Sequence, residues 1–265
     1  MDNIYCNGEF TLGNWTFKDW KPGGHGHVNL HQSIAQSCDI FFYQAGLKVG
    51  GDVMAKYAQA FGLGSPTGID LGGERFGLVP FSPAQRQRAK RSWLPGDTVN
   101  MSIGQGQLLV TPLQIARMMG AVANGGVMWK PRLVQRVERA DGTLAYGSSS
   151  QMTERVDLSP VVWAFLRHSL AAVVKDGTGA LARVPGIDIA GKTGTAQTIS
   201  KSDSAKGQDH AWFASFAPVD DPQYVVVVLV ERGGKGGGIA APIARQIYEA
   251  IFLQKVAQVT LGESG

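Results

Sequence analysis

Apolar residues recur at helical spacing across residues 28–49, which predicts helices with one buried face. The sequence Ser-Cys-Asp at 37–39 interrupts this spacing and divides the stretch into two helices. We expect Asp39 to be the N-cap of the second helix, because a short acidic side chain accepts the free N–H groups of a first turn. A third short helix is expected over residues 52–61, with Gly62 as its stop signal.

Turn signals dominate residues 62–110, which are rich in Gly and Pro. Turns are expected at Ser65-Pro66, Gly72-Gly73, Ser82-Pro83 and Pro95-Gly96. The next segment begins a clear helix, with Thr111 as N-cap, Pro112 at the first position and Gly125 after the end.

The second half of the chain begins with a hairpin and a helix. Residues 129–146 alternate around Asp141-Gly142, which predicts a hairpin. Ser159-Pro160 opens a helix to about Val174, whose inward face is expected to carry Val162, Phe165, Leu166 and Leu170.

Three short apolar segments near the C-terminus predict strands at 187–197, 211–217 and 223–231. Because they follow one another closely, an antiparallel meander is expected. A helix from Pro242 to about Phe252 follows, so residues 187–256 supply the sheet strands and the C-terminal helix. Residues 1–27 show little periodicity and are expected to form loops or a short hairpin. This order predicts an α+β fold class.

Composition excludes several functional classes. Hydrophobic residues make up 44% and charged residues 17%, which is typical of a globular protein. The net charge of +4 (25 basic minus 21 acidic) is too mild to indicate nucleic-acid binding, and the basic cluster at 86–91 is expected to be a solvated loop. The longest apolar run, 224–230, is far shorter than the roughly 20 residues of a membrane span. We also expect no signal peptide and no membrane anchor in this chain.

Residues 189–196, Ile-Ala-Gly-Lys-Thr-Gly-Thr-Ala, are the most informative segment. An ordinary strand can contain Lys and Thr, but the two glycines weaken a strand and suit close approach of a ligand to the backbone. Alternate spacing places the hydroxyls of Thr193 and Thr195 on one face of the strand. With the cation of Lys192 beside them, the segment is suited to a carboxylate and an oxyanion.

The sequence Lys192-Thr193-Gly194-Thr195 matches the Lys-Thr-Gly motif of penicillin-binding proteins and β-lactamases. Ser37-Cys38-Asp39 resembles their Ser-x-Asn motif, with Asp in place of Asn. Other segments resemble class B penicillin-binding proteins in the same order along the chain, at residues 41–44, 67–71, 104–106, 111–114 and 123–126. Residues 20–26 and the Ser-x-Asp variant resemble the elongation-type subgroup, penicillin-binding protein 2. The resemblance implies a β-lactamase/transpeptidase-like fold, an antiparallel sheet with helices.

The family's first motif, Ser-x-x-Lys, supplies the nucleophile, and no serine of this chain has a lysine three positions on. In the family this motif precedes the Ser-x-Asn motif by several tens of residues, and the strands that complete the sheet are also upstream. Only 36 residues precede Ser37. We therefore expect residues 1–265 to be a partial penicillin-binding transpeptidase domain, incomplete on its N-terminal side and inactive alone.

The resemblance also implies roles for the residues that are present. In the family, the serine attacks a D-alanyl-D-alanine carbonyl, and the amine of a second stem peptide resolves the acyl-enzyme and cross-links peptidoglycan. The implied catalytic residues are Ser37, which passes a proton toward the departing amine, Asp39, which supports it, and Lys192, near the same proton network. Asp39 in place of Asn adds a negative charge beside this relay.

The substrate-binding residues implied by the resemblance are Thr193, Gly194 and Thr195. The two threonine hydroxyls would bind the substrate carboxylate. The N–H of Thr195 would supply one oxyanion donor, and the absent serine would supply the other.

The loop-rich segment 1–40 contains a candidate metal site made of Cys6, Asp19, His25 and Cys38. Thiolate, carboxylate and imidazole are the usual zinc ligands, and four of them suit a closed structural site. Some elongation-type members bind zinc at matching positions, so a structural zinc is implied, whereas catalysis needs no cofactor. Two alternatives are a Cys6–Cys38 disulfide, as found in a periplasm, and a buried free Cys38. His27 and His31 are expected at the surface.

The implied partners are stem peptides ending in D-Ala-D-Ala, β-lactams and a glycan-polymerising elongation partner. The parent protein would lie on the periplasmic side of the cytoplasmic membrane. Two other functions stay open: a non-enzymatic module that docks an elongation partner, and a serine β-lactamase or D,D-carboxypeptidase relative. Both of the latter enzymes need the same missing serine.

Overall fold

The computed structural model describes residues 3–80, 92–197 and 209–262. The expected turn at Ser82-Pro83 and the basic cluster at 86–91 lie outside these ranges. The N-terminal segment forms two small antiparallel pairs: β1 (Ile4–Cys6) with β4 (Gly26–Val28), and the hairpin β2 (Glu9–Leu12) with β3 (Trp15–Lys18). The short hairpin expected here is therefore confirmed.

Four helices follow within the described ranges, and the junction of the first two carries Ser37 and Asp39. They are α1 (Leu30–Gln36), α2 (Asp39–Val49), α3 (Gly51–Ala60) and α5 (Pro95–Ser102). The break between α1 and α2 falls at the Ser-Cys-Asp sequence, as predicted. The turn expected at Pro95-Gly96 is wrong, because these residues open α5, with Pro at its first position and Asp97 accepting from the N–H of Leu94.

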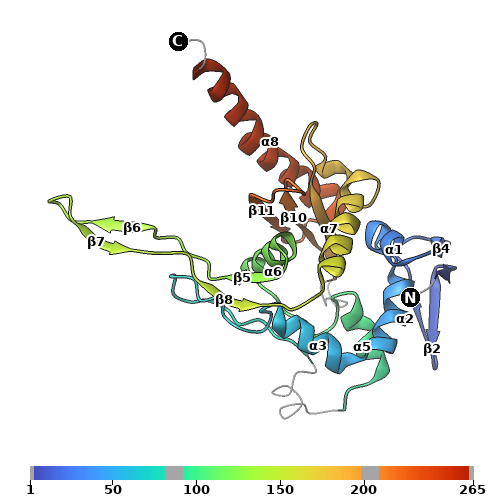
Figure 1. Ribbon diagram of the computed structural model, residues 1–265. Coiled ribbons are helices and arrows are strands. Elements are labelled where there is room, and N and C mark those ends of the chain that lie inside the picture. The colour runs from blue at the N-terminus through green and yellow to red at the C-terminus, as the bar shows by residue number, and fades with distance from the viewer. Residues whose placement is uncertain (1–2, 81–91, 198–208, 263–265) are drawn as a thin grey trace.

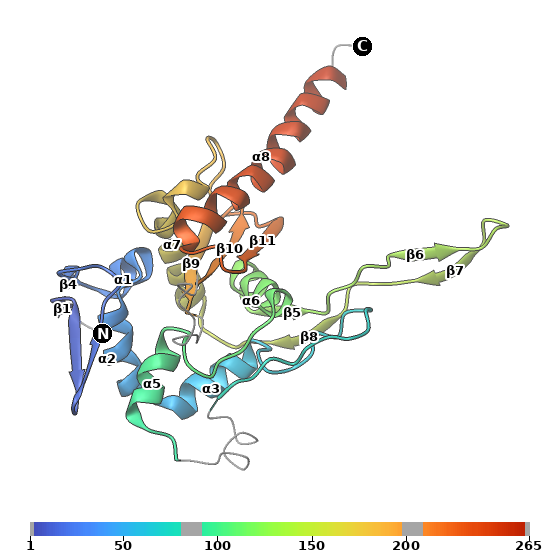
Figure 2. The same ribbon diagram turned by 180° about the vertical axis from the view of Figure 1, so that it is seen from behind.

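Helix α6 (Pro112–Asn124) has the predicted ends, since the Thr111 side chain accepts from the N–H of Gln114 and Gly125 has a φ of 80°. A long two-stranded arm follows and extends from the body in both views (Figures 1 and 2). Its base is β5 (Val127–Trp129) paired with β8 (Met152–Arg155), and its outer part is β6 (Arg136–Glu138) paired with β7 (Leu144–Gly147). The predicted turn at Asp141-Gly142 is confirmed, but the hairpin is longer than expected.

Helix α7 (Pro160–Lys175) begins where predicted and leads through η1 (Ala180–Ala182) to the sheet. The expectation that Val162 faces inward is wrong. Val162 is 40% exposed, whereas its neighbour Trp163 is 4% exposed and packs in the core. Successive side chains of a helix are about 100° apart around its axis, so Val162 and Trp163 cannot both face the core, and the bulky indole of Trp163 does.

The central sheet has the order β11-β10-β9 and is the predicted antiparallel meander. Its strands are β9 (Ala190–Ala196), β10 (His210–Ala217) and β11 (Tyr224–Val230). Apolar clusters cover both faces, because alternate residues of β10 point to opposite sides. Ala214 and Phe216 pack with α6 and α7, and Ala211 and Phe213 pack with the last helix, α8. Figure 2 shows α8 crossing the strands in front of the sheet.

Helix α8 (Gly236–Gly262) begins earlier than the predicted start at Pro242, which lies inside the helix. Its first turn is made of glycines that approach other elements closely. A Cβ on Gly236 would collide with the carbonyl of Gly194, and a Cβ on Gly237 with the carbonyl of Thr178. The helix starts where only glycine fits against β9, and this contact is not visible in the local sequence.

The helices of the described ranges include none that combines the length and the apolar character needed to cross a membrane.

Candidate active site

The turn between α1 and α2 presents Ser37. This residue is the C-cap of α1 and adopts a left-handed conformation with φ 56° and ψ 49°, an uncommon geometry for a residue with a side chain. The backbone N–H of Cys38 bonds back to the carbonyl of Ser33 at 3.1 Å, which closes the end of the helix. The turn therefore holds Ser37 out of both helices and directs it toward the sheet.

Lys192 on β9 meets Ser37 across the fold. Its Nζ donates to Ser37 Oγ at 2.8 Å and to the carbonyl of Thr193 at 3.3 Å. Burial lowers the pKa of Lys192 to about 8, and the nearby Asp39 carboxylate opposes this shift. A lysine with a pKa near neutrality can hold or release a proton at little cost, which suits a proton relay. The two residues predicted to share a proton network are thus in contact.

Asp39 does not cap α2, which corrects the prediction from sequence. The N-cap is Cys38, and Asp39 is the first residue of the helix. Its carboxylate instead accepts from the backbone N–H of Trp20 at 3.0 Å. Burial, with the charge of Asp19 as a second cause, raises the pKa of Asp39 to about 6. The Asp39 side chain accepts a hydrogen bond from a distant segment of the chain, so it does not accept from the N–H groups of its own helix.

Strand β9 presents the Lys-Thr-Gly-Thr residues along the edge of the sheet. The hydroxyl of Thr193 lies 2.7 Å from that of Thr178, and the hydroxyl of Thr195 accepts from Gly236 N–H at 3.4 Å. Gln105 reaches this edge from the predicted 104–106 segment, and its side-chain amide donates to the carbonyl of Thr195 at 2.9 Å. Gly194 is paired with Trp212 of β10.

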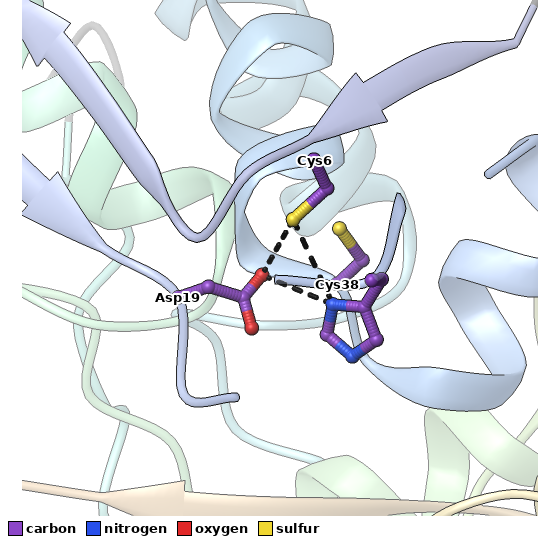
Figure 3. A group of neighbouring side chains, drawn as sticks. Cys6, Asp19 and Cys38 are labelled. Carbon is purple, nitrogen blue, oxygen red and sulfur yellow. Dashed lines mark hydrogen bonds and ion pairs between the residues drawn. The ribbon is translucent and has the colours of Figure 1, made fainter. Parts of the chain in front are cut away.

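Beside this site, Cys6, Asp19, His25 and Cys38 form one buried cluster. Their ligand atoms all lie within 4.8 Å of one another, and the side chains of Asp19 and His25 are 0% and 1% exposed. Figure 3 shows the side chains of Cys6, Asp19 and Cys38 pointing toward a common point. The two cysteines are free thiols, so the disulfide alternative is not formed. Burial raises the pKa of the Cys38 thiol.

The separations inside the cluster suit a small tetrahedral ion. Cys6 Sγ lies 3.4 Å from Asp19 Oδ2 and 3.8 Å from His25 Nδ1, and the latter two atoms lie 3.3 Å apart. Ligands that hold zinc at about 2.0–2.3 Å in a tetrahedron lie about 3.3–3.8 Å from one another. His25 Nε2 has no hydrogen-bond partner among the described residues. The donor types and their spacing can therefore hold a metal such as zinc.

Trp20 connects this cluster with the Ser37 turn, and the sequence did not single it out as a functional residue. Its indole N–H donates to the carbonyls of Ser37 at 2.9 Å and Gln36 at 3.1 Å. Its ring centroid lies 5.6 Å from that of His25. Trp20 follows Asp19 directly, so a short backbone segment joins the cluster to the relay residues.

The other histidines lie outside both sites. His27 is exposed, as expected, and His31 is partly exposed. His31 stacks on His168 with ring centroids 4.9 Å apart, and its Nδ1 lies 3.0 Å from Ser169 Oγ. His210 accepts from the backbone N–H of Arg232 at 3.0 Å.

The geometry defines a class of site: a hydroxyl, a buried lysine and a carboxylate beside an edge strand with two threonines. A family model for the penicillin binding protein transpeptidase domain matches residues 3–249, and the chain belongs to this family.

Named relatives agree with this assignment. The chain is 34% identical to peptidoglycan D,D-transpeptidase MrdA of Haemophilus influenzae over 275 residues, 97% of this chain and 41% of that protein. The chain thus spans about two fifths of the length of this curated relative.

Solved structures show the same fold. Pseudomonas aeruginosa PBP2 in complex with WCK 5153 is 33% identical, with a TM-score of 0.81. The match covers 95% of this chain and 56% of the PBP2 chain. The complex of PBP2 and MreC from Helicobacter pylori matches at 32% identity and a TM-score of 0.77, over 94% of this chain and 45% of its own. The predicted α+β transpeptidase-like fold is confirmed.

Proposed function

We propose that this chain provides the substrate-binding and proton-relay part of a peptidoglycan D,D-transpeptidase that cross-links stem peptides in cell-wall elongation. The observation that carries the proposal is the 2.8 Å hydrogen bond from Lys192 to Ser37, which joins the two motifs into one site. The family membership and the named peptidoglycan D,D-transpeptidases support the same function.

The proposed reaction proceeds through a serine acyl-enzyme. A serine hydroxyl attacks the carbonyl between two D-alanines, the C–N bond breaks, and the terminal D-alanine leaves with a proton. The amine of a second peptide then attacks the ester, releases the serine and forms the cross-link. The 265 residues contain no Ser-x-x-Lys sequence, so we propose that this chain alone does not perform the attack.

The residues that are present serve the proton and the carboxylate. Lys192, with its lowered pKa, and Ser37 would deliver a proton to the departing amine. The Asp39 carboxylate lies beside them and favours the charged form of Lys192. Thr193 and Thr195 would bind the terminal carboxylate of the substrate or of a β-lactam, because their hydroxyls lie on the strand that also carries the lysine.

We also propose that Cys6, Asp19, His25 and Cys38 hold a structural zinc ion. The observations in favour are the four donor atoms within 4.8 Å of one another, their burial and the chemistry of the set. When bound, the ion would cross-link residues from four segments and stabilise the folded state. The Cys38 ligand lies between Ser37 and Asp39, so the cluster would also fix the turn that carries them.

The partner and the compartment belong to the same proposal. We propose that the parent protein acts on the periplasmic side of the cytoplasmic membrane, with a glycan-polymerising elongation partner. The match to the PBP2 and MreC complex of Helicobacter pylori supports a protein partner for the parent protein, since it is a structure of that relative with a partner.

The substrate class can be tested without catalysis. Titration of the isotope-labelled chain with diacetyl-L-lysyl-D-alanyl-D-alanine should shift the NMR signals of Ser37 and β9, with a weak affinity. Lys192→Met should remove these shifts, and the matched change at exposed Lys175, Lys175→Met, should leave them. Equal shifts in both variants, or shifts confined to other parts of the chain, would reject the proposed site.

A further inference from the structure

Thr178 lies between the two motif-bearing halves of the site. Its backbone N–H donates to the carbonyl of Ala35 in α1 at 3.2 Å, just before Ser37. Its hydroxyl lies 2.7 Å from the hydroxyl of Thr193 on β9. Thr178, which lies just beyond the end of α7, therefore contacts both the helix that leads to Ser37 and the strand that carries Lys192.

The surrounding glycines confine the backbone of Thr178. A Cβ on Gly177 would collide with the carbonyl of Ala35, and a Cβ on Gly237 would lie 2.5 Å from the carbonyl of Thr178. The segment is thus packed between α1 on one side and the first turn of α8 on the other. The backbone of Thr178 cannot shift without moving both helices. Its hydroxyl is then placed by the 2.7 Å contact with the hydroxyl of Thr193.

The pair of hydroxyls has a direction once a ligand is bound. Each hydroxyl carries one proton and can also accept. An ionised carboxylate only accepts, so Thr193 must give its proton to the ligand. Thr178 must then donate to the oxygen of Thr193, and a hydrogen bond received by a hydroxyl strengthens the one that it donates.

We propose that Thr178 is a positioning residue that holds the Thr193 hydroxyl as a donor toward the ligand carboxylate. This rests on the proposed function of β9 as the carboxylate-binding strand. Thr178 acts through Thr193 and does not contact the ligand. Its effect is therefore on the recognition of the carboxylate, separate from the general packing of the site.

The test compares two ligands that differ only in the C-terminal group, an ionised carboxylate in one and a neutral carboxamide in the other. The full 265-residue chain is titrated by NMR with diacetyl-L-lysyl-D-alanyl-D-alanine and with its C-terminal carboxamide. The wild-type chain should prefer the carboxylate. Thr178→Val should reduce this preference roughly fivefold, the size expected for one hydrogen bond. Thr178→Ser should retain the preference, and Thr178→Val should have no further effect in a Thr193→Val background.

Each outcome decides the matter. If Thr178→Val weakens the binding of both ligands equally, or keeps the preference for the carboxylate over the carboxamide, the proposal is overturned. If the wild-type chain has no preference for the carboxylate, the proposed function of β9 fails, and this inference fails with it. Should Thr178→Val not fold, Thr178→Ala and Thr178→Ser form the decisive pair, because both lack the γ-methyl and differ in the hydroxyl.

Discussion

Lys192 Nζ donates a 2.8 Å hydrogen bond to Ser37 Oγ, although 155 positions separate the two residues in the chain. A different local structure positions each residue for this contact. Ser37 lies in a left-handed turn at the end of α1, and Lys192 lies on the edge strand β9. The contact depends on the docking of the N-terminal helices against the sheet.

The lowered pKa of Lys192 predicts unusual chemical reactivity. With a pKa of about 8, its amine is largely neutral at pH 9, where an ordinary lysine is charged. Competitive acetylation followed by mass spectrometry should show Lys192 reacting with a midpoint near pH 8 in the native chain. Exposed Lys175 is the internal reference, and denaturation should abolish the difference. A midpoint above pH 10 in the folded chain would contradict the burial argument.

The same shift has a definite sign for stability. The folded pKa lies below the unfolded value, so the unfolded chain binds more protons between about pH 8 and 10.5. The contribution of Lys192 to stability therefore rises across this window and is lost as the pH falls through about 8. The melting temperatures of the wild-type chain and of Lys192→Met, each plotted against pH, should have different slopes within this window. Parallel plots would refute the linkage.

Zinc binding can be measured directly. The chain purified without a histidine tag should contain about one zinc per molecule, and chelation should lower its melting temperature. Cys38→Ser should lose most of the metal, whereas a change at exposed His27, His27→Ala, should keep it. Less than one zinc in several chains would reject the metal site and leave a buried pair of thiols.

Penicillin labelling tests the missing nucleophile. Removing the nucleophile of a coupled catalytic unit lowers the rate on the order of a millionfold, so the chain should form no covalent adduct with a fluorescent penicillin. A full-length relative serves as the positive control in the same gel. A labelled serine anywhere within residues 1–265 would overturn this prediction.

Adjacent glycines after α6 give a matched pair for stability. Gly125 and Gly126 both have positive φ, at 80° and 107°, but a Cβ on Gly125 meets nothing within 4 Å. A Cβ on Gly126 would collide with the carbonyl of Val156 and the ring of Trp163. Gly125→Ala should cost about 1 kcal/mol from backbone conformation alone, and Gly126→Ala distinctly more, in urea unfolding. Equal losses would show that the collision is relieved.

An apolar row on α8 predicts limited solubility. Ile239, Ile243 and Ile247 are 43%, 37% and 37% exposed, and within the described residues β11 pairs on one side only. We expect the chain to be poorly soluble or marginally stable, so a cooperative monomeric melt above about 60 °C would contradict this. Ile243→Lys should raise the soluble yield, whereas Ala244→Lys, at a fully buried neighbour, should prevent folding.

Sequence predicted the elements whose signals are local. The ends of α6 follow from Thr111, Pro112 and Gly125, and the three sheet strands follow from their apolar runs. It did not predict what depends on distant contacts. Asp39 binds the Trp20 N–H instead of capping its own helix, and α8 starts early because its glycines pack on β9 and Thr178.

The candidate site divides in the same way. The residue types and the motifs named Ser37, Lys192 and the four cluster residues, since each carries distinctive chemistry. The sequence did not indicate Trp20 and Thr178, because each acts through hydrogen bonds to a carbonyl or a hydroxyl that any tryptophan or threonine can make. Only the fold shows which of them make such contacts.

The arm formed by β6 and β7 adds a practical possibility. The residues of β6 and β7 are all exposed, and the turn that joins these strands lies at the far end of the arm, away from the helices and the central sheet (Figure 1). Exposed loop tips tolerate insertion, because little buried structure depends on them. A fluorophore, an affinity tag or a small reporter domain grafted at this turn would therefore give a handle for surface immobilisation and single-molecule observation.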